Sequence, residues 1–175
     1  HGAGVDPAAG AVRPSVRGEV ARAFLPFESG DEDFRLPAED AACVDTWRDA
    51  TGREIRTLQP PETAGAPDNR AESLVFHLPL ETETWDAEDT QPGAPNAATP
   101  STSRTDGLGR LVSLVRRLRE GGAVREVAIR YGYDPGGRLA SVTDPMGNVR
   151  RHRHDGLGRR LFVHDPNAGT FERTF

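Results

Sequence analysis

Tyr131-Gly132-Tyr133-Asp134-Pro135-Gly136-Gly137-Arg138 decides how this chain folds, because its last five residues belong to a phrase that recurs. The pattern Asp-x-x-Gly-Arg also stands at residues 106–110 and 155–159, and in a looser copy at 49–53. The three close copies begin 28 and then 21 residues apart. Such a period is typical of repeat architectures, in which each unit buries its apolar face only against its neighbours. The sequence therefore predicts a repeat protein before it predicts any chemistry.

The repeated phrase has the composition of a tight hairpin turn. Asp accepts hydrogen bonds from backbone N–H groups two residues on, Pro presets φ, and the later Gly takes the positive φ that closes the hairpin. We expect the Arg that follows each turn to lie beside the carboxylate of its own or a neighbouring repeat. Between turns, Val127, Ile129, Tyr131 and Tyr133 share one face of a strand at period two. Residues 111–119 fit either a strand or a short amphipathic helix, and their position within the repeat favours a strand.

Three regions follow one another along the chain. Residues 1–43 are expected to be loop-rich and in part disordered, since residues 1–20 are rich in Gly, Ala and Pro without a period. Residues 44–104 read as divergent hairpins with strands at 53–58, 72–78 and 81–85, followed by a Pro-rich loop over 89–105. Residues 105–175 carry the tight repeats, with later strands at 138–143, 148–154, 160–164 and 170–175. We expect a piece of a longer protein, because the chain opens at His1 and stops inside a repeat.

Composition excludes several classes of protein. No apolar run reaches the length of a membrane span, and the single cysteine, Cys43, excludes an intrachain disulfide and any multi-cysteine zinc site. Its acidic surroundings favour a packed thiol over a nucleophile. Residues 105–175 carry 13 Arg against 8 acidic residues. Because no aromatic platform is interleaved with these arginines, we expect inter-strand ion pairs and no nucleic-acid partner.

The complete unit resembles the YD repeat of the RHS family. Here it reads Tyr131-Gly132-Tyr133-Asp134, then Gly137-Arg138-Leu139, with Gly147 at the far turn. The next unit has His152 and His154 in the two tyrosine places, and Phe175 fills the last aromatic place of the unit after it. The resemblance is specific over residues 105–175. It is looser over 44–104, where residues 84–90 and the Pro-rich segment look similar to the B component of Tc insecticidal toxins.

The positions that we expect to build the repeat are Asp49, Gly52, Arg53, Asp106, Gly109, Arg110, Tyr131, Tyr133, Asp134, Gly137, Arg138, Gly147, His152, His154, Asp155, Gly158 and Arg159.

The resemblance implies an all-β fold of antiparallel hairpin repeats that form part of a spiralling sheet and a hollow shell. In this family, which includes polymorphic toxins, teneurins and the B and C components of Tc toxin complexes, the shell encloses a C-terminal toxin or effector. The implied role is structural, in a secreted or cell-surface protein. The implied partners are the rest of the shell, the enclosed polypeptide and other toxin-complex subunits. Some members end the shell with an aspartyl autoprotease region, which nothing here resembles, so no catalytic residue and no cofactor are expected.

Two other functional classes stay open on the sequence alone. Broad sheets that expose aromatic residues and arginines also suit a cell-surface adhesion or carbohydrate-binding module. An enzyme would have to use carboxylates near Trp85, such as Glu81 with Glu83 or the 86–89 segment.

Metal and phosphate sites are less favoured than plain structural roles. His152 and His154, with His164 on a later strand, could hold a metal, but we expect them to stack between strands. The acidic run 28–33 could hold calcium, but it lacks the spacing of a calcium loop and reads as hydrated surface. The Asp-Gly-Leu-Gly copies are not followed by a helix and do not form a phosphate-binding fingerprint.

Overall fold

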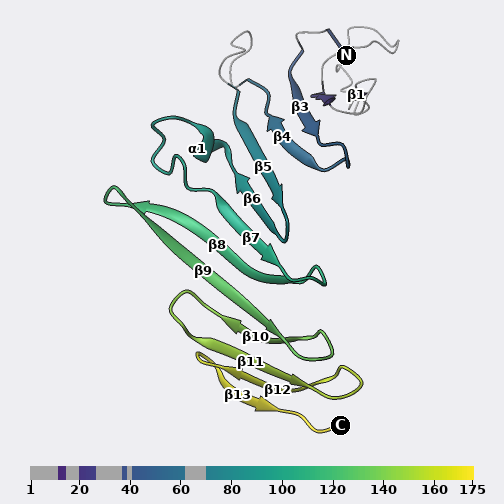
Figure 1. Ribbon diagram of the computed structural model, residues 1–175, viewed down its shortest axis with the longest axis vertical. Coiled ribbons are helices and arrows are strands. Elements are labelled where there is room, and N and C mark those ends of the chain that lie inside the picture. The colour runs from purple at the N-terminus through teal and green to yellow at the C-terminus, as the bar shows by residue number, and fades with distance from the viewer. Residues whose placement is uncertain (1–11, 15–19, 27–36, 39–40, 62–69) are drawn as a thin grey trace, which may run out of the picture. The chain divides into compact units, whose positions relative to one another are not determined.

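The computed structural model describes residues 12–14, 20–26, 37–38, 41–61 and 70–175. Within these ranges the chain forms thirteen β-strands and one short helix, so the predicted all-β class is confirmed. The chain divides into two compact units, one of residues 1–76 with 85–98 and one of residues 77–84 with 99–175. Within each unit, successive strands pair antiparallel with their neighbours in the sequence, as Figure 1 shows. No helix in the described residues has the length and apolar character needed to span a membrane.

The first unit is a row of five strands. They are β1 (Val12–Pro14), β2 (Val20–Phe24), β3 (Cys43–Arg48), β4 (Glu54–Leu58) and β5 (Glu72–Leu78). Among the described residues of this unit, the buried apolar side chains are Phe24 and Cys43, which face each other in the β2–β3 register.

The second unit consists of eight strands joined mainly by tight turns. They are β6 (Glu81–Trp85), β7 (Ser101–Thr105), β8 (Leu111–Glu120), β9 (Ala123–Tyr133), β10 (Leu139–Thr143), β11 (Val149–His154), β12 (Arg160–Asp165) and β13 (Gly169–Glu172). Residues 111–119 lie in β8, so the strand reading of that segment is confirmed and the helical alternative is wrong.

Two sequence expectations need correction. The loop predicted over 89–105 is wrong at both ends, because α1 (Ala87–Thr90) enters it and β7 closes it. The strand β7 was missed because Ser-Thr-Ser-Arg-Thr has no apolar alternation; it is held between β6 and β8, and Thr102 is 2% exposed. The last strand ends at Glu172 rather than Phe175. The described part of segment 1–43 contains β1 and β2, and the prediction that the segment is loop-rich stays a prediction.

Helix α1 has a local cause. Asp86 is its N-cap, and its carboxylate accepts hydrogen bonds from the backbone N–H groups of Glu88 (2.9 Å) and Asp89 (3.0 Å). The Asp89 carboxylate accepts in return from the Asp86 N–H at 2.9 Å. This reciprocal capping box satisfies backbone donors that a single helical turn leaves unpaired.

Candidate functional site

The turn at residues 106–110 shows why the repeated phrase has its composition. The Asp106 N–H donates to the Arg110 carbonyl at 2.9 Å, and the Gly109 N–H donates to the Asp106 carbonyl at 2.9 Å. One carboxylate oxygen of Asp106 accepts from the N–H groups of Leu108 and Arg110, and the other accepts from Arg110 Nε at 2.7 Å. Gly109 has φ 76°, the left-handed value of the last loop residue in a three-residue hairpin. Each residue of the phrase therefore has a separate task in one turn.

The same turn recurs at the other copies of the phrase. The distance from the Arg Nε to the Asp carboxylate is 2.7 Å at 49–53, 2.8 Å at 134–138 and 2.6 Å at 155–159. The glycines of these turns, Gly52, Gly137 and Gly158, have φ between 80° and 84°. The copy at 49–53, which looked looser in sequence, has the same hydrogen-bond pattern, with the Thr51 hydroxyl as one more donor to Asp49.

In two further turns, the Asp carboxylate is held by a residue other than an arginine that follows the turn. At 144–148, Gly147 keeps φ 87°, but Asn148 replaces the arginine and donates from Nδ2 to Asp144 at 2.8 Å. At the turn after β12, the carboxylate of Asp165 pairs with Arg150, which lies on β11, at 2.5 Å. A carboxylate held by a cation or an amide is therefore common to the hairpin turns of the second unit that begin with Asp.

Electrostatics favours the ionised form of these carboxylates. The side chain of Arg110 lowers the pKa of Asp106, and the Arg110 N–H adds to the effect. The backbone N–H of Arg138 is the main cause of the lowered pKa of Asp134. Desolvation works to raise the pKa of Asp155, but hydrogen bonds from Arg159 outweigh it and the pKa is lowered. Each of these turns therefore favours an ionised Asp carboxylate.

Aromatic rings couple one repeat to the next. The guanidinium of Arg110 lies 4.6 Å from the centre of the Tyr133 ring, and the Tyr133 hydroxyl donates to the Leu111 carbonyl at 2.7 Å. Arg159 lies over Phe175 at the same distance of 4.6 Å. A turn arginine thus contacts its own aspartate and the aromatic residue that ends the following hairpin, which is a favourable cation–π geometry.

His152 and His154 occupy the places of Tyr131 and Tyr133 in the next unit. The Nδ1 atoms of both histidines are buried and have no hydrogen-bond partner among the described residues. His154 Nδ1 lies 3.9 Å from the Asp134 carboxylate. Burial, followed by the positive charge of Arg160, lowers the pKa of His152. No group of three His, Cys, Asp or Glu in the described residues could hold a metal ion, and His164 contacts Thr170 instead.

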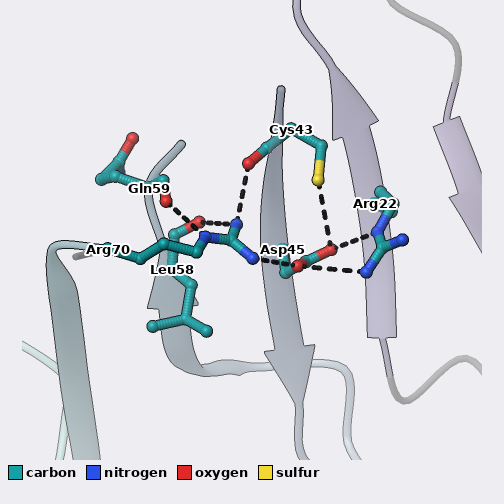
Figure 2. Close-up of polar contacts among 6 residues, drawn as sticks. All are labelled: Arg22, Cys43, Asp45, Leu58, Gln59 and Arg70. Atoms are coloured by element: carbon teal, nitrogen blue, oxygen red, sulfur yellow. Dashed lines mark hydrogen bonds and ion pairs between the residues drawn. The ribbon is translucent and has the colours of Figure 1, made fainter. Parts of the chain in front are cut away.

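A buried charge cluster in the first unit was not predicted. Asp45 on β3 is 3% exposed and accepts from Arg22 Nε at 2.7 Å and from Arg70 Nη1 at 2.7 Å. Figure 2 shows that Arg70 also donates to the carbonyls of Gln59, Leu58 and Cys43, at 2.7, 3.0 and 2.8 Å. Burial works to raise the pKa of Asp45, but the two arginines hold it below its usual value. The cluster ties strands β2, β3 and β4 to Arg70, two residues before β5.

The other residues that were considered as a nucleophile or as acid–base carboxylates are packed, ion-paired or hydrogen-bonded within the protein. Cys43 is buried, with Sγ 4.0 Å from the Asp45 carboxylate. Glu81 pairs with Arg104 at 2.6 Å, and Glu88 accepts from Asn96. The acidic run 28–33 lies outside the described residues.

Comparison with known proteins identifies the repeat. Residues 133–170 match the family model of the RHS repeat. No curated protein matches the chain. Among solved structures, the chain is similar to the crystal structure of TcdB2-TccC3-Cdc42, with a TM-score of 0.71, 20% sequence identity and 93% of this chain covered.

Two further structures show the same fold. One is TcdB2-TccC3 without its hypervariable C-terminal region, with a TM-score of 0.65 and 18% identity over 95% of this chain. The other is the Photorhabdus luminescens Tc holotoxin pore, with a TM-score of 0.61 and 18% identity over 95% of this chain. The chain spans 8% of the first of these structures and 10% of the other two. The chain thus carries an RHS repeat over residues 133–170, and its likeness to these structures is one of fold.

Proposed function

We propose that this chain is a wall segment of a hollow RHS-type shell that encloses a toxin or effector polypeptide. The observation that carries the proposal is the placement of Arg110 between Asp106 and Tyr133. One residue of the repeated phrase closes its own turn and contacts the next repeat. Nearest-neighbour contacts of this kind stabilise an extended array of repeats, because no unit closes a core alone. The RHS match and the fold similarity support the same role.

In this role the chain acts mechanically. The sheet would keep other proteins, including proteases, away from the enclosed polypeptide. The turns and the aromatic contacts would keep the wall continuous. No catalytic residue is required. The partners would be the rest of the shell, the enclosed polypeptide and other subunits of a toxin complex. A secreted or cell-surface location follows from the same proposal, as does membership of a longer polypeptide.

Protease protection tests the proposal. The longer polypeptide would be purified with its enclosed region and digested with a nonspecific protease, and cleavage of the enclosed region would be followed by mass spectrometry. We expect this region to survive in the wild type and to be cleaved when Gly137→Val opens the turn between β9 and β10. Arg104→Gln, at an exposed ion pair, should leave protection unchanged. Equal cleavage in the wild type and in Gly137→Val would count against enclosure.

The adhesion or carbohydrate-binding alternative gains no specific support from the site. Tyr133, a natural stacking residue for a sugar, has its ring under Arg110 and its hydroxyl bound to a backbone carbonyl. Glycan binding that is lost in Tyr131→Ala, with the fold retained, would nevertheless favour that class.

A further inference from the structure

The β8–β9 hairpin is longer than the strands beside it. β8 has ten residues and β9 has eleven, whereas β7 and β10 have five each. β7 pairs with β8 only as far as Val115, and β10 pairs with β9 only from Arg130 onward. Residues 116–129 therefore form a two-stranded ribbon that projects past both neighbours, drawn in green in Figure 1.

The outer edge of β9 is open along this ribbon. Two glycines at its tip have φ 58° and 85°, as in a two-residue hairpin turn, which makes Glu120 and Ala123 a hydrogen-bonded pair. Hydrogen-bonded and non-hydrogen-bonded pairs alternate from that point along the ladder. In the described part of the chain, no strand pairs with the outward backbone groups of Val124, Glu126 and Ala128. Such an edge is a template for the addition of another strand.

The ribbon is strongly basic. Residues 116–129 contain four arginines and two glutamates, which leaves a net charge of +2. The glutamates pair loosely with Arg117 at 3.2 Å and with Arg125 at 3.5 Å. Arg116 and Arg130 have no ion pair with any described residue. The apolar side chain of Val124 is 46% exposed beside these charges.

We propose that the outer edge of β9, residues 124–128, binds an extended acidic segment of another polypeptide as an added strand. Backbone groups of the segment would pair with those of Val124, Glu126 and Ala128. A carboxylate of the segment would lie next to Arg125 on one face of the ribbon, and a β-branched side chain would lie next to Val124 on the other face. This inference is independent of the enclosure proposed above, because it needs only the projecting hairpin.

The choice of a peptide follows from the geometry. A row of alternating N–H and C=O groups matches another backbone, whereas phosphates would use only the donors. The excess of positive charge selects a segment of opposite charge and disfavours a basic one, because like charges directly opposite each other destabilise a strand pair.

Fluorescence anisotropy with labelled peptides tests the proposal on the whole chain. The probe is a peptide of about nine residues in which Glu alternates with Val and Thr, which has strong β propensity. We expect saturable binding that weakens as salt is added. Three control peptides are a Lys-for-Glu version, a version N-methylated at alternate backbone positions, and a Pro-containing version. None of them should bind.

Protein variants separate the edge from general charge. Ala128→Pro removes an outward N–H without touching the β8 ladder, and we expect it to abolish binding. Arg125→Gln should weaken binding about two- to five-fold, as a lost cross-strand charge pair would. Arg104→Gln, which lies on β7, should change nothing. Circular dichroism would show that each variant keeps its strands.

Results of three kinds would overturn the proposal. The first kind comes from the peptides, and is either equal binding of the acidic and N-methylated peptides or no binding of the acidic peptide at millimolar concentration. The second is self-association of the chain that Ala128→Pro abolishes, which would make a second copy the occupant. The third is displacement of the peptide by a single-stranded oligonucleotide with an unchanged response to Ala128→Pro, which would indicate a charge surface for nucleic acid.

Discussion

Replacing Arg70 by Met is expected to destabilise the first unit more than any exchange at an exposed arginine. The Arg70 side chain is 15% exposed and donates to three backbone carbonyls and to Asp45, whose side chain is 4% exposed. Without Arg70, the remaining ion-pair partner of Asp45 among the described residues is Arg22, whose side chain is 38% exposed. Met retains much of the apolar stem of Arg, so the loss measures the guanidinium rather than the packing.

The magnitude follows from the hydrogen bonds and the ion pair that the exchange removes. Hydrogen bonds that involve a charged group contribute about 1.5–3 kcal/mol each, but four donations from one group do not add. Breaking a buried ion pair from one side costs about 3–5 kcal/mol when the remaining charge is left uncompensated. Asp45 keeps its pair with Arg22, but three backbone carbonyls lose the donor that Arg70 supplies. We therefore expect the free energy of unfolding of the first unit to fall by about 3–5 kcal/mol. The matched exchange Arg104→Met, at a side chain that is 60% exposed, should cost less than about 1 kcal/mol.

Denaturant titration followed by tryptophan fluorescence measures this difference, because Trp47 lies on β3, two residues from Asp45. Hydrogen exchange of the β2–β4 amides would localise it. A loss below about 1 kcal/mol for Arg70→Met, equal to that for Arg104→Met, would refute the claim that Arg70 is a structural clamp. The double variant Arg70→Met with Asp45→Asn should recover part of the loss, because it removes the buried charge that Arg70→Met leaves behind.

Three further predictions concern the repeats. Gly109→Ala should destabilise the second unit by about 1–2 kcal/mol because Gly109 has φ 76°, whereas Gly107→Ala in the same turn meets no steric obstacle and should be neutral or stabilising; equal effects by thermal unfolding would contradict the turn geometry. Tyr133→Phe should cost about 0.5–1.5 kcal/mol through loss of the 2.7 Å hydrogen bond to the Leu111 carbonyl, and an unchanged unfolding midpoint would show that this bond contributes nothing. Because burial lowers the pKa of His152, the unfolded chain binds the proton more tightly, so stability should decline as the pH falls below about 6.5. His152→Phe should flatten that decline between about pH 7 and 5, and identical pH profiles would argue against a half-buried neutral imidazole.

The hairpin turns could be predicted from the sequence because their causes are local. The Asp, the Gly with positive φ and the following Arg lie within five residues, and their chemistry specifies one loop. Strand β8 could also be predicted, because a segment between two hairpin turns is expected to be a strand. The cap of α1 was readable in principle, because Asp86 and Asp89 have capping-box spacing, although the box was not recognised.

The missed features depend on residues that are distant in sequence. Arg70 is 25 residues from Asp45, and neither residue belongs to a motif. Strand β7 has polar side chains throughout, so only its neighbours define it as a strand. The partner of the Tyr133 ring, Arg110, is 23 positions earlier, and this contact could not be inferred from periodicity. Turns are therefore easier to predict from sequence patterns than the contacts that join one repeat to the next.

A cryo-electron microscopy map of the longer polypeptide that we propose to contain this chain tests the central claim most directly. We predict that residues 101–172 lie in the wall of a closed shell, and that density for a further polypeptide fills its interior. An open sheet with both faces in solvent, or a closed shell from which this chain projects, would contradict the account.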